Sequence, residues 1–248
     1  MITFDHNYMM TDHVGDEHGI STEELNTVSQ LTEKANSRMA DEKKKGKLGF
    51  MEIPYDGDIV PSIREFRDRC GDRFNTIAVV GIGGSALGPQ ALKSSLSHLY
   101  LNELSDEQRK GRYRVYFFDN VDPYEIHSLE DVIDVSRTIF LVISKSGGTT
   151  ETNANFAIML DALKKAVGDR YNEQIVAITD PQKGVLRRVA EEEGFVTFPV
   201  PSNVGGRFSV LSAVGLVMAE FIGIDAEALL AGARNVIEKY SGQSLFKN

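Results

Sequence analysis

The sequence predicts an α/β fold in which helices cover both faces of an open parallel sheet. Five short runs are rich in β-branched and aromatic residues and almost continuously apolar, as strands buried on both faces of a parallel sheet are. Amphipathic helical patterns separate these runs, and loops rich in glycine or hydroxyl groups follow several of them. In this architecture, ligands bind beyond the carboxyl ends of the strands.

The predicted strands read TIAVV (76–80), RVYFF (114–118), TIFLVI (138–143), QIVAI (174–178) and FVTF (195–198). The clearest helix between them covers residues 150–167, where apolar residues recur at helical spacing until Gly168 ends the pattern. A further helix is predicted ahead of the sheet, from the capping-box pair Ser21 and Glu24 to about Ala40. The charged run DEKKKGK that follows it is expected to be a solvated end.

Composition excludes several classes of protein. The formal charge is −9 at pH 7 without a basic cluster, which argues against nucleic acid, and no apolar stretch approaches the roughly 20 residues that span a bilayer. The single Cys70 excludes an intrachain disulfide, and the polar amino end does not resemble a signal peptide, so a cytoplasmic setting is expected. The irregular spacing of His6, His13 and His18 favours a surface arm over a metal site.

The first strand leads into the glycine-rich loop GIGGS, residues 81–85, and then into a helix near Leu87. Glycines let backbone N–H groups approach an anion closely, and the amino end of a helix favours negative charge. The loop therefore suits an oxyanion such as phosphate. The alternatives are a tight turn in which the glycines serve only sterically, and a dinucleotide site. A dinucleotide fingerprint requires an acidic residue about 20 positions further on, and Asp119 lies well beyond that, so the spacing argues against NAD.

The third strand ends in SKSGGTTET, residues 144–152. Four hydroxyls occur within seven residues, from Ser144, Ser146, Thr149 and Thr150, whereas capping a helix requires only one. The surplus favours a phosphomonoester, held by hydroxyls and backbone amides; Lys145 either adds attraction or points to solvent. Because both loops follow strands of one parallel sheet, they lie at the same edge of it. A dinucleotide site would not require the second, hydroxyl-rich loop, whereas a phosphosugar site would use it to hold the phosphate.

The segment VPSNVGGRFSVLSAVGL, residues 200–216, follows the last strand. Arg207 comes after two glycines and is predicted to open an amphipathic helix that includes Phe208 and Leu211. A cation is disfavoured at the amino end of a helix, so an anionic partner is expected. That partner is either the substrate phosphate or negative charge that develops on a substrate oxygen.

These three segments, in this order, resemble the signature segments of the glucose-6-phosphate isomerase family, within the wider family of sugar-isomerase (SIS) domains. The resemblance covers roughly residues 45–240. It implies a three-layer αβα sandwich with a flavodoxin-like five-stranded parallel sheet, and a homodimeric enzyme that needs no metal or organic cofactor. The implied reaction interconverts glucose 6-phosphate and fructose 6-phosphate in glycolysis and gluconeogenesis. Gly147 and Gly148 point to the bacterial branch.

The resemblance also implies roles for individual residues. The implied phosphate contacts are Ser144, Ser146 and Thr149, with Lys145 contributing mainly its backbone. Gly84 and Ser85 are the implied sugar-side contacts, and Gly206 is a further implied substrate-binding residue. Arg207 matches an arginine that stabilises the enediolate intermediate.

The family's catalytic glutamate, ring-opening histidine and carboxyl-terminal lysine have no counterpart in these 248 residues. We therefore expect the first SIS domain of a longer protein, inactive or nearly so by itself. Its expected parts are an arm and helix (1–45), a phosphosugar-binding SIS domain (46–224) and a terminal helix (225–248). Glu151 and His127 are weaker candidates for the proton carrier.

Two other functions remain open. One is a separate SIS domain that binds a phosphosugar as a regulator, and the other is an aldose-ketose isomerase for a different phosphosugar.

Overall fold

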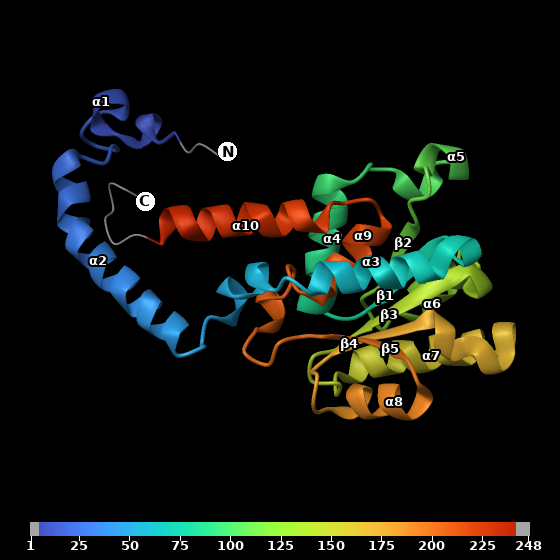
Figure 1. Ribbon diagram of the computed structural model, residues 1–248. Helices are drawn as coiled ribbons and strands as arrows, with labels where there is room; N and C mark the ends of the chain where they lie inside the picture. Colours follow the sequence, from blue (N-terminus) through green and yellow to red (C-terminus); the bar gives the residue numbers. More distant parts are fainter. Residues whose placement is uncertain (1–4, 242–248) are drawn as a thin grey trace. The chain divides into compact units, whose positions relative to one another are not determined.

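The computed structural model describes residues 5–241 and contains a five-stranded, all-parallel sheet (Figure 1). The strand order is β2-β1-β3-β4-β5, the order of flavodoxin-like folds. The strands are β1 (Thr76–Val80), β2 (Arg114–Phe118), β3 (Thr138–Ile143), β4 (Ile175–Thr179) and β5 (Val196–Pro199). The predicted fold class is therefore confirmed. The first three strands have the predicted bounds, and the last two each lie one residue further on.

Helices cover both faces of the sheet, so the architecture is the expected three-layer sandwich (Figure 1). Ile77 and Val79 of β1 face one core with α3 and α9, whereas Ala78 and Val80 face the other core with α7 and α8. This alternation is the two-residue period of a strand buried on both sides. The helices that follow residue 49 are α3 (Ile59–Cys70), α4 (Gly84–Leu96), α5 (Asp106–Arg109), α6 (Pro123–Glu130), α7 (Thr150–Val167), α8 (Val185–Glu193), α9 (Ala213–Phe221) and α10 (Ala226–Tyr240).

The chain divides into two compact units, and the sheet lies entirely in the unit formed by residues 49–233. The other unit comprises residues 1–48 and 234–248, of which 242–248, the end of the predicted terminal segment, lie outside the described residues. The predicted division at residues 45 and 224 stays a prediction. No helix within residues 5–241 has both the length and the apolar character needed to cross a membrane.

The amino-terminal unit contains α1 (Thr11–Val14) and α2 (Thr22–Lys44). Ser21 and Glu24 form the predicted capping box at the start of α2. The predicted end near Ala40 is wrong, because the helix continues into the charged run and ends within it, at Lys44. Lysine and glutamate are good helix formers, and cations are favoured in the last turn, where Lys43 and Lys44 lie.

The prediction that Arg207 opens an amphipathic helix is also wrong. Residues Gly206–Phe208 form a single 3₁₀ turn, and α9 begins only at Ala213. The Ser212 hydroxyl accepts a hydrogen bond from the Val214 N–H at that end. Every residue of α9 is buried, so the helix lacks a polar face from which its start could be predicted.

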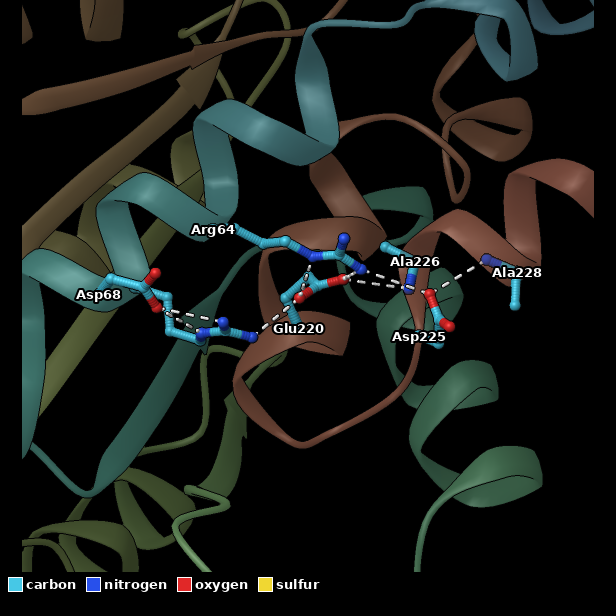
Figure 2. Close-up of polar contacts among 7 residues, drawn as sticks. Arg64, Asp68, Glu220, Asp225, Ala226 and Ala228 are labelled. Atoms are coloured by element: carbon cyan, nitrogen blue, oxygen red, sulfur yellow. Dashed lines mark hydrogen bonds and ion pairs between the residues drawn. The ribbon is translucent and has the colours of Figure 1, made fainter.

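A buried carboxylate joins three of these helices (Figure 2). Glu220 of α9 has a side chain that is 4% exposed, and it accepts hydrogen bonds from Arg64 and Arg67 of α3 at 3.0–3.1 Å. It also accepts the backbone N–H of Ala226 at 3.2 Å, while Asp225 accepts that of Ala228 at 3.1 Å. Glu220 thus fixes the start of α10 against α9 and α3.

Candidate active site

Loops that follow four strands line one cavity of about 640 Å³ at the carboxyl edge of the sheet. The chain runs outward in opposite directions from β1 and β3, and this switch point is where open parallel sheets bind ligands. The cavity is lined by Ile82, Gly84, Ser85, Ser144, Lys145, Ser146, Thr149, Asp180, Lys183, Gly184, Ser202 and Gly206. These include every residue that was predicted to contact the substrate, namely Gly84, Ser85, Ser144, Lys145, Ser146, Thr149 and Gly206. Its volume suits a small organic ligand.

The hydroxyl-rich loop after β3 leaves hydroxyl groups available to a ligand. The hydroxyl oxygens of Ser144 and Thr149 lie 3.3 Å apart, and Ser144 is 2% exposed. Thr149 is the N-cap residue of α7, yet its side chain makes no hydrogen bond to the amino end of that helix. The helix therefore presents uncapped N–H groups beside these hydroxyls, an arrangement that suits an oxyanion. Thr150, the fourth hydroxyl of the run, is exposed and does not line the cavity.

The glycine-rich loop after β1 begins α4 earlier than predicted, at Gly84 rather than near Leu87. Gly83, with φ of 58°, is its N-cap residue, and a side chain there would be strained. A Cβ atom on Gly84 would lie only 2.3 Å from the carbonyl oxygen of Gly206. The absence of side chains in this loop thus lets the backbone of residues 205–207 pack directly against it, which brings the first and third predicted segments together.

Lys145 neither points to solvent nor lies free beside the hydroxyls. Its Nζ atom donates hydrogen bonds to the carbonyl oxygens of Ser202 and Val204, at 2.7 and 2.8 Å. The lysine thereby connects the loop after β3 with the segment after β5. Its charge is engaged in holding these two walls of the cavity together.

A fourth wall, the turn DPQKG of residues 180–184 after β4, was missed in the sequence. Asp180 is 4% exposed, and its Oδ1 atom accepts the N–H groups of Gln182 and Lys183 at 3.0 and 3.2 Å. These bonds, that of Gln182 foremost, lower the pKa of Asp180. In the sequence, the Asp-Pro pair after a strand indicates a turn, but it does not place that turn at the cavity.

Glycines hold this turn directly on the hydroxyl-rich loop. A Cβ atom on Gly184, which has φ of 109°, would lie 2.7 Å from the carbonyl oxygen of Ser146. A Cβ atom on Gly147, with φ of 68°, would lie 2.6 Å from the backbone nitrogen of Leu186. The backbones of the two loops are therefore in contact, and each restricts the position of the other.

Three predicted candidates lie outside the cavity lining. Arg207 is exposed, next to the lining residue Gly206, and its guanidinium makes no hydrogen bond or ion pair with any described residue. Glu151 is exposed in the first turn of α7. His127 has a side chain that is 79% exposed and contacts Glu130 at 3.0 Å. Neither Glu151 nor His127 is placed to move a proton on a ligand inside the cavity.

The fold and the cavity define a flavodoxin-like α/β domain with a ligand site at its switch point. Residues 61–248 match the family described as phosphoglucose isomerase, and the chain belongs to this family. It is 45% identical over 215 residues to a glucose-6-phosphate isomerase of Carboxydothermus hydrogenoformans, covering 85% of this chain and 45% of that protein.

Two further proteins are similar to this chain, one in sequence and one in structure. A glucose-6-phosphate isomerase of Rubrobacter xylanophilus is 40% identical over 244 residues, covering 98% of this chain and 54% of that protein. The crystal structure of a hypothetical protein from Thermus thermophilus superposes with a TM-score of 0.80 at 36% identity, covering 90% of this chain and 52% of that one. The chain thus spans about half the length of the relatives that it matches.

Proposed function

We propose that this chain is the phosphosugar-binding part of a glucose-6-phosphate isomerase, which interconverts glucose 6-phosphate and fructose 6-phosphate. The observation that carries the proposal is the single cavity in which the loops after β1, β3, β4 and β5 meet. It combines hydroxyls at the amino end of α7, which hydrogen-bond only within their own loop, with backbone surfaces from two glycine-rich segments. Family membership and the names of the relatives support this choice of substrate.

In this proposal the phosphate lies at the hydroxyl-rich end of the cavity. Ser144, Ser146 and Thr149 donate hydrogen bonds to it, and the uncapped N–H groups of α7 add partial positive charge. The sugar extends toward the opposite wall, formed by Gly84, Ser85 and Gly206. This polarity of binding would orient the reacting carbons, because the phosphate fixes one end of the open-chain sugar.

The isomerisation moves a proton between C2 and C1 through an enediolate, whose negative charge needs a fixed cation. We assign this role to Arg207. Its guanidinium has no partner among the described residues, and it adjoins the sugar-side wall through Gly206. Neither candidate base of this chain lines the cavity, so the proposed base belongs to the part of the relatives' length that this chain does not span.

We further propose that the complete enzyme is a cytoplasmic homodimer of the bacterial type. The bacterial origin of the named relatives supports the assignment to that branch. Size-exclusion chromatography with light scattering on the longest reading frame that contains this chain would test the dimer; a monomer at micromolar concentration would contradict it.

Calorimetric titration of this chain with fructose 6-phosphate tests the binding role. We expect Ser144→Ala combined with Thr149→Ala to weaken binding by roughly 10- to 100-fold, because each lost hydrogen bond to a charged group is worth about 1.5–3 kcal/mol and is partly replaced by water. Fructose, which lacks the phosphate, is expected to bind far more weakly than fructose 6-phosphate.

The matched control removes two hydroxyls elsewhere, by Thr27→Ala combined with Thr32→Ala on α2. These hydroxyls donate only to carbonyl oxygens of their own helix. Equal weakening by both double variants, or equal affinity for fructose and fructose 6-phosphate, would contradict the phosphate assignment.

A further inference from the structure

We propose that Lys183 supplies the mobile positive charge that recognises the phosphate in this cavity. The inference rests on the proposed function and deepens it, since neither the sequence pattern nor the family match assigns a role to this residue. It concerns a specificity-determining contact rather than a group that takes part in proton transfer.

The first observation is that the cavity has two lysines and only one of them is available. Lys145 is held by the carbonyl oxygens of Ser202 and Val204. Lys183 also lines the cavity, is exposed, and its ammonium forms no hydrogen bond or ion pair with any described residue. A phosphate that enters the cavity can therefore pair with Lys183 without breaking an existing contact.

The second observation is that the backbone of Lys183 is fixed although its side chain is not. Its N–H donates to the buried Asp180 carboxylate at 3.2 Å, and the Asp180 N–H donates to the carbonyl oxygen of Lys145 at 3.3 Å. The next residue, Gly184, packs on the carbonyl of Ser146. These contacts hold the start of the lysine side chain beside the hydroxyls that we assign to the phosphate, so little backbone ordering is needed on binding.

The third observation is the charge of the cavity wall. The Asp180 carboxylate is ionised at neutral pH and lines the same cavity, where its backbone hydrogen bonds, and with them the charges of Lys183 and Lys145, lower its pKa. A phosphate dianion placed beside an ionised carboxylate is repelled unless a cation lies close to both. Lys183 follows Asp180 by three residues in one turn and can lie near both anions. Its charge would offset Asp180 and favour phosphorylated over neutral sugars.

The test compares Lys183→Met, which retains an unbranched side chain without charge, with Lys183→Arg, which retains the charge. Titration of the 248-residue chain with fructose 6-phosphate at low ionic strength should show about 5- to 10-fold weaker binding by Lys183→Met and near-normal binding by Lys183→Arg. The loss should shrink toward unity near 1 M salt, where the Debye length is about 3 Å. A merely structural role would not respond to salt in this way.

Two further measurements show whether the loss of affinity arises at the phosphate end of the ligand and is specific to Lys183. Inorganic phosphate should lose a similar factor in Lys183→Met, because the lysine acts on the phosphate end of the ligand. Lys44→Met, which removes one charge from the other compact unit, should leave both affinities unchanged.

The outcomes separate the two proposals. Unchanged affinity in Lys183→Met, alongside weakened binding by the Ser144 and Thr149 double variant, would overturn the role of Lys183 and leave the phosphate site standing. Weakened binding of fructose 6-phosphate but not of inorganic phosphate would also overturn it, because the lysine would then act on the sugar. If the unchanged chain bound neither ligand, the proposed function itself would be wrong.

Discussion

Replacing Gly84 by alanine tests the contact that joins the first and third segments of the site. The new Cβ atom would lie 2.3 Å from the carbonyl oxygen of Gly206 and 2.5 Å from its carbonyl carbon, about 1 Å inside ordinary contact distance. Both of these are backbone atoms, so no flexible side chain can move away. Either α4 or the segment that carries Gly206 and Arg207 must shift by about that distance.

We expect Gly84→Ala to lower the free energy of unfolding by about 1–3 kcal/mol, the usual cost of overpacking. We also expect weaker binding of fructose 6-phosphate, because the displaced segment lines the cavity at the wall that we assign to the sugar. Urea denaturation followed by circular dichroism measures the first effect, and calorimetric titration measures the second.

Gly232→Ala provides the matched control. Gly232 lies inside α10, within the same compact unit, and no atom of residues 5–241 lies within 4 Å of its added Cβ atom apart from the helix's own backbone and the chain neighbours. Alanine is favoured over glycine inside a helix by about 0.8–1 kcal/mol, so this variant should gain stability and keep its affinity. If Gly84→Ala also gained stability and bound fructose 6-phosphate normally, the contact between the two segments would be refuted.

Three other predictions concern the core and the chemistry. Glu220→Gln should lower the free energy of unfolding, measured by urea denaturation, by about 1–2 kcal/mol, because it weakens charged hydrogen bonds to two half-exposed arginines. As a control, Glu65→Gln at an exposed ion pair should change this free energy by less than about 0.5 kcal/mol. Equal effects of the two substitutions would contradict the role of the buried Glu220 network. Burial raises the pKa of the Cys70 thiol from 9.0 to about 11, so its contribution to stability is complete below pH 9 and declines as the pH rises toward 11. Thiol reagents should react with folded Cys70 only as fast as the chain opens, and rapid labelling of the folded chain at about pH 9, the ordinary thiol pKa, would show the burial to be wrong. In the longest reading frame that contains this chain, Arg207→Ala should lower kcat more than it raises KM, and a change in KM alone would make Arg207 a binding residue.

Much of the fold follows from local patterns in the sequence. Strands such as TIFLVI are buried on both faces, so their apolar runs have nearly the bounds of the strands themselves. Boundaries were misjudged where local patterns compete with tertiary contacts. The start of α4 depends on the fit between Gly84 and Gly206, which lie far apart in the sequence, and the buried α9 lacks the polar face that would mark its start.

The site was predictable to the extent that each wall has an unusual composition. The hydroxyl and glycine clusters after β1 and β3 identify two walls, because the ends of neighbouring parallel strands must meet. The role of Lys145 was not predictable, since its acceptors are backbone carbonyl groups that any sequence would supply. Asp180 and Lys183 were missed because one aspartate and one lysine in a turn have no distinctive spacing, and only the strand order places them in the cavity.

A crystal structure of this chain with fructose 6-phosphate tests the assignment of the phosphate site most directly. We predict that the phosphate lies within hydrogen-bond distance of the hydroxyls of Ser144 and Thr149, at the amino end of α7, and that the sugar lies toward Gly84 and Ser85. A phosphate at the Gly84 end of the cavity, or a ligand bound outside the cavity altogether, would contradict the assignment of the phosphate to the hydroxyl-rich loop.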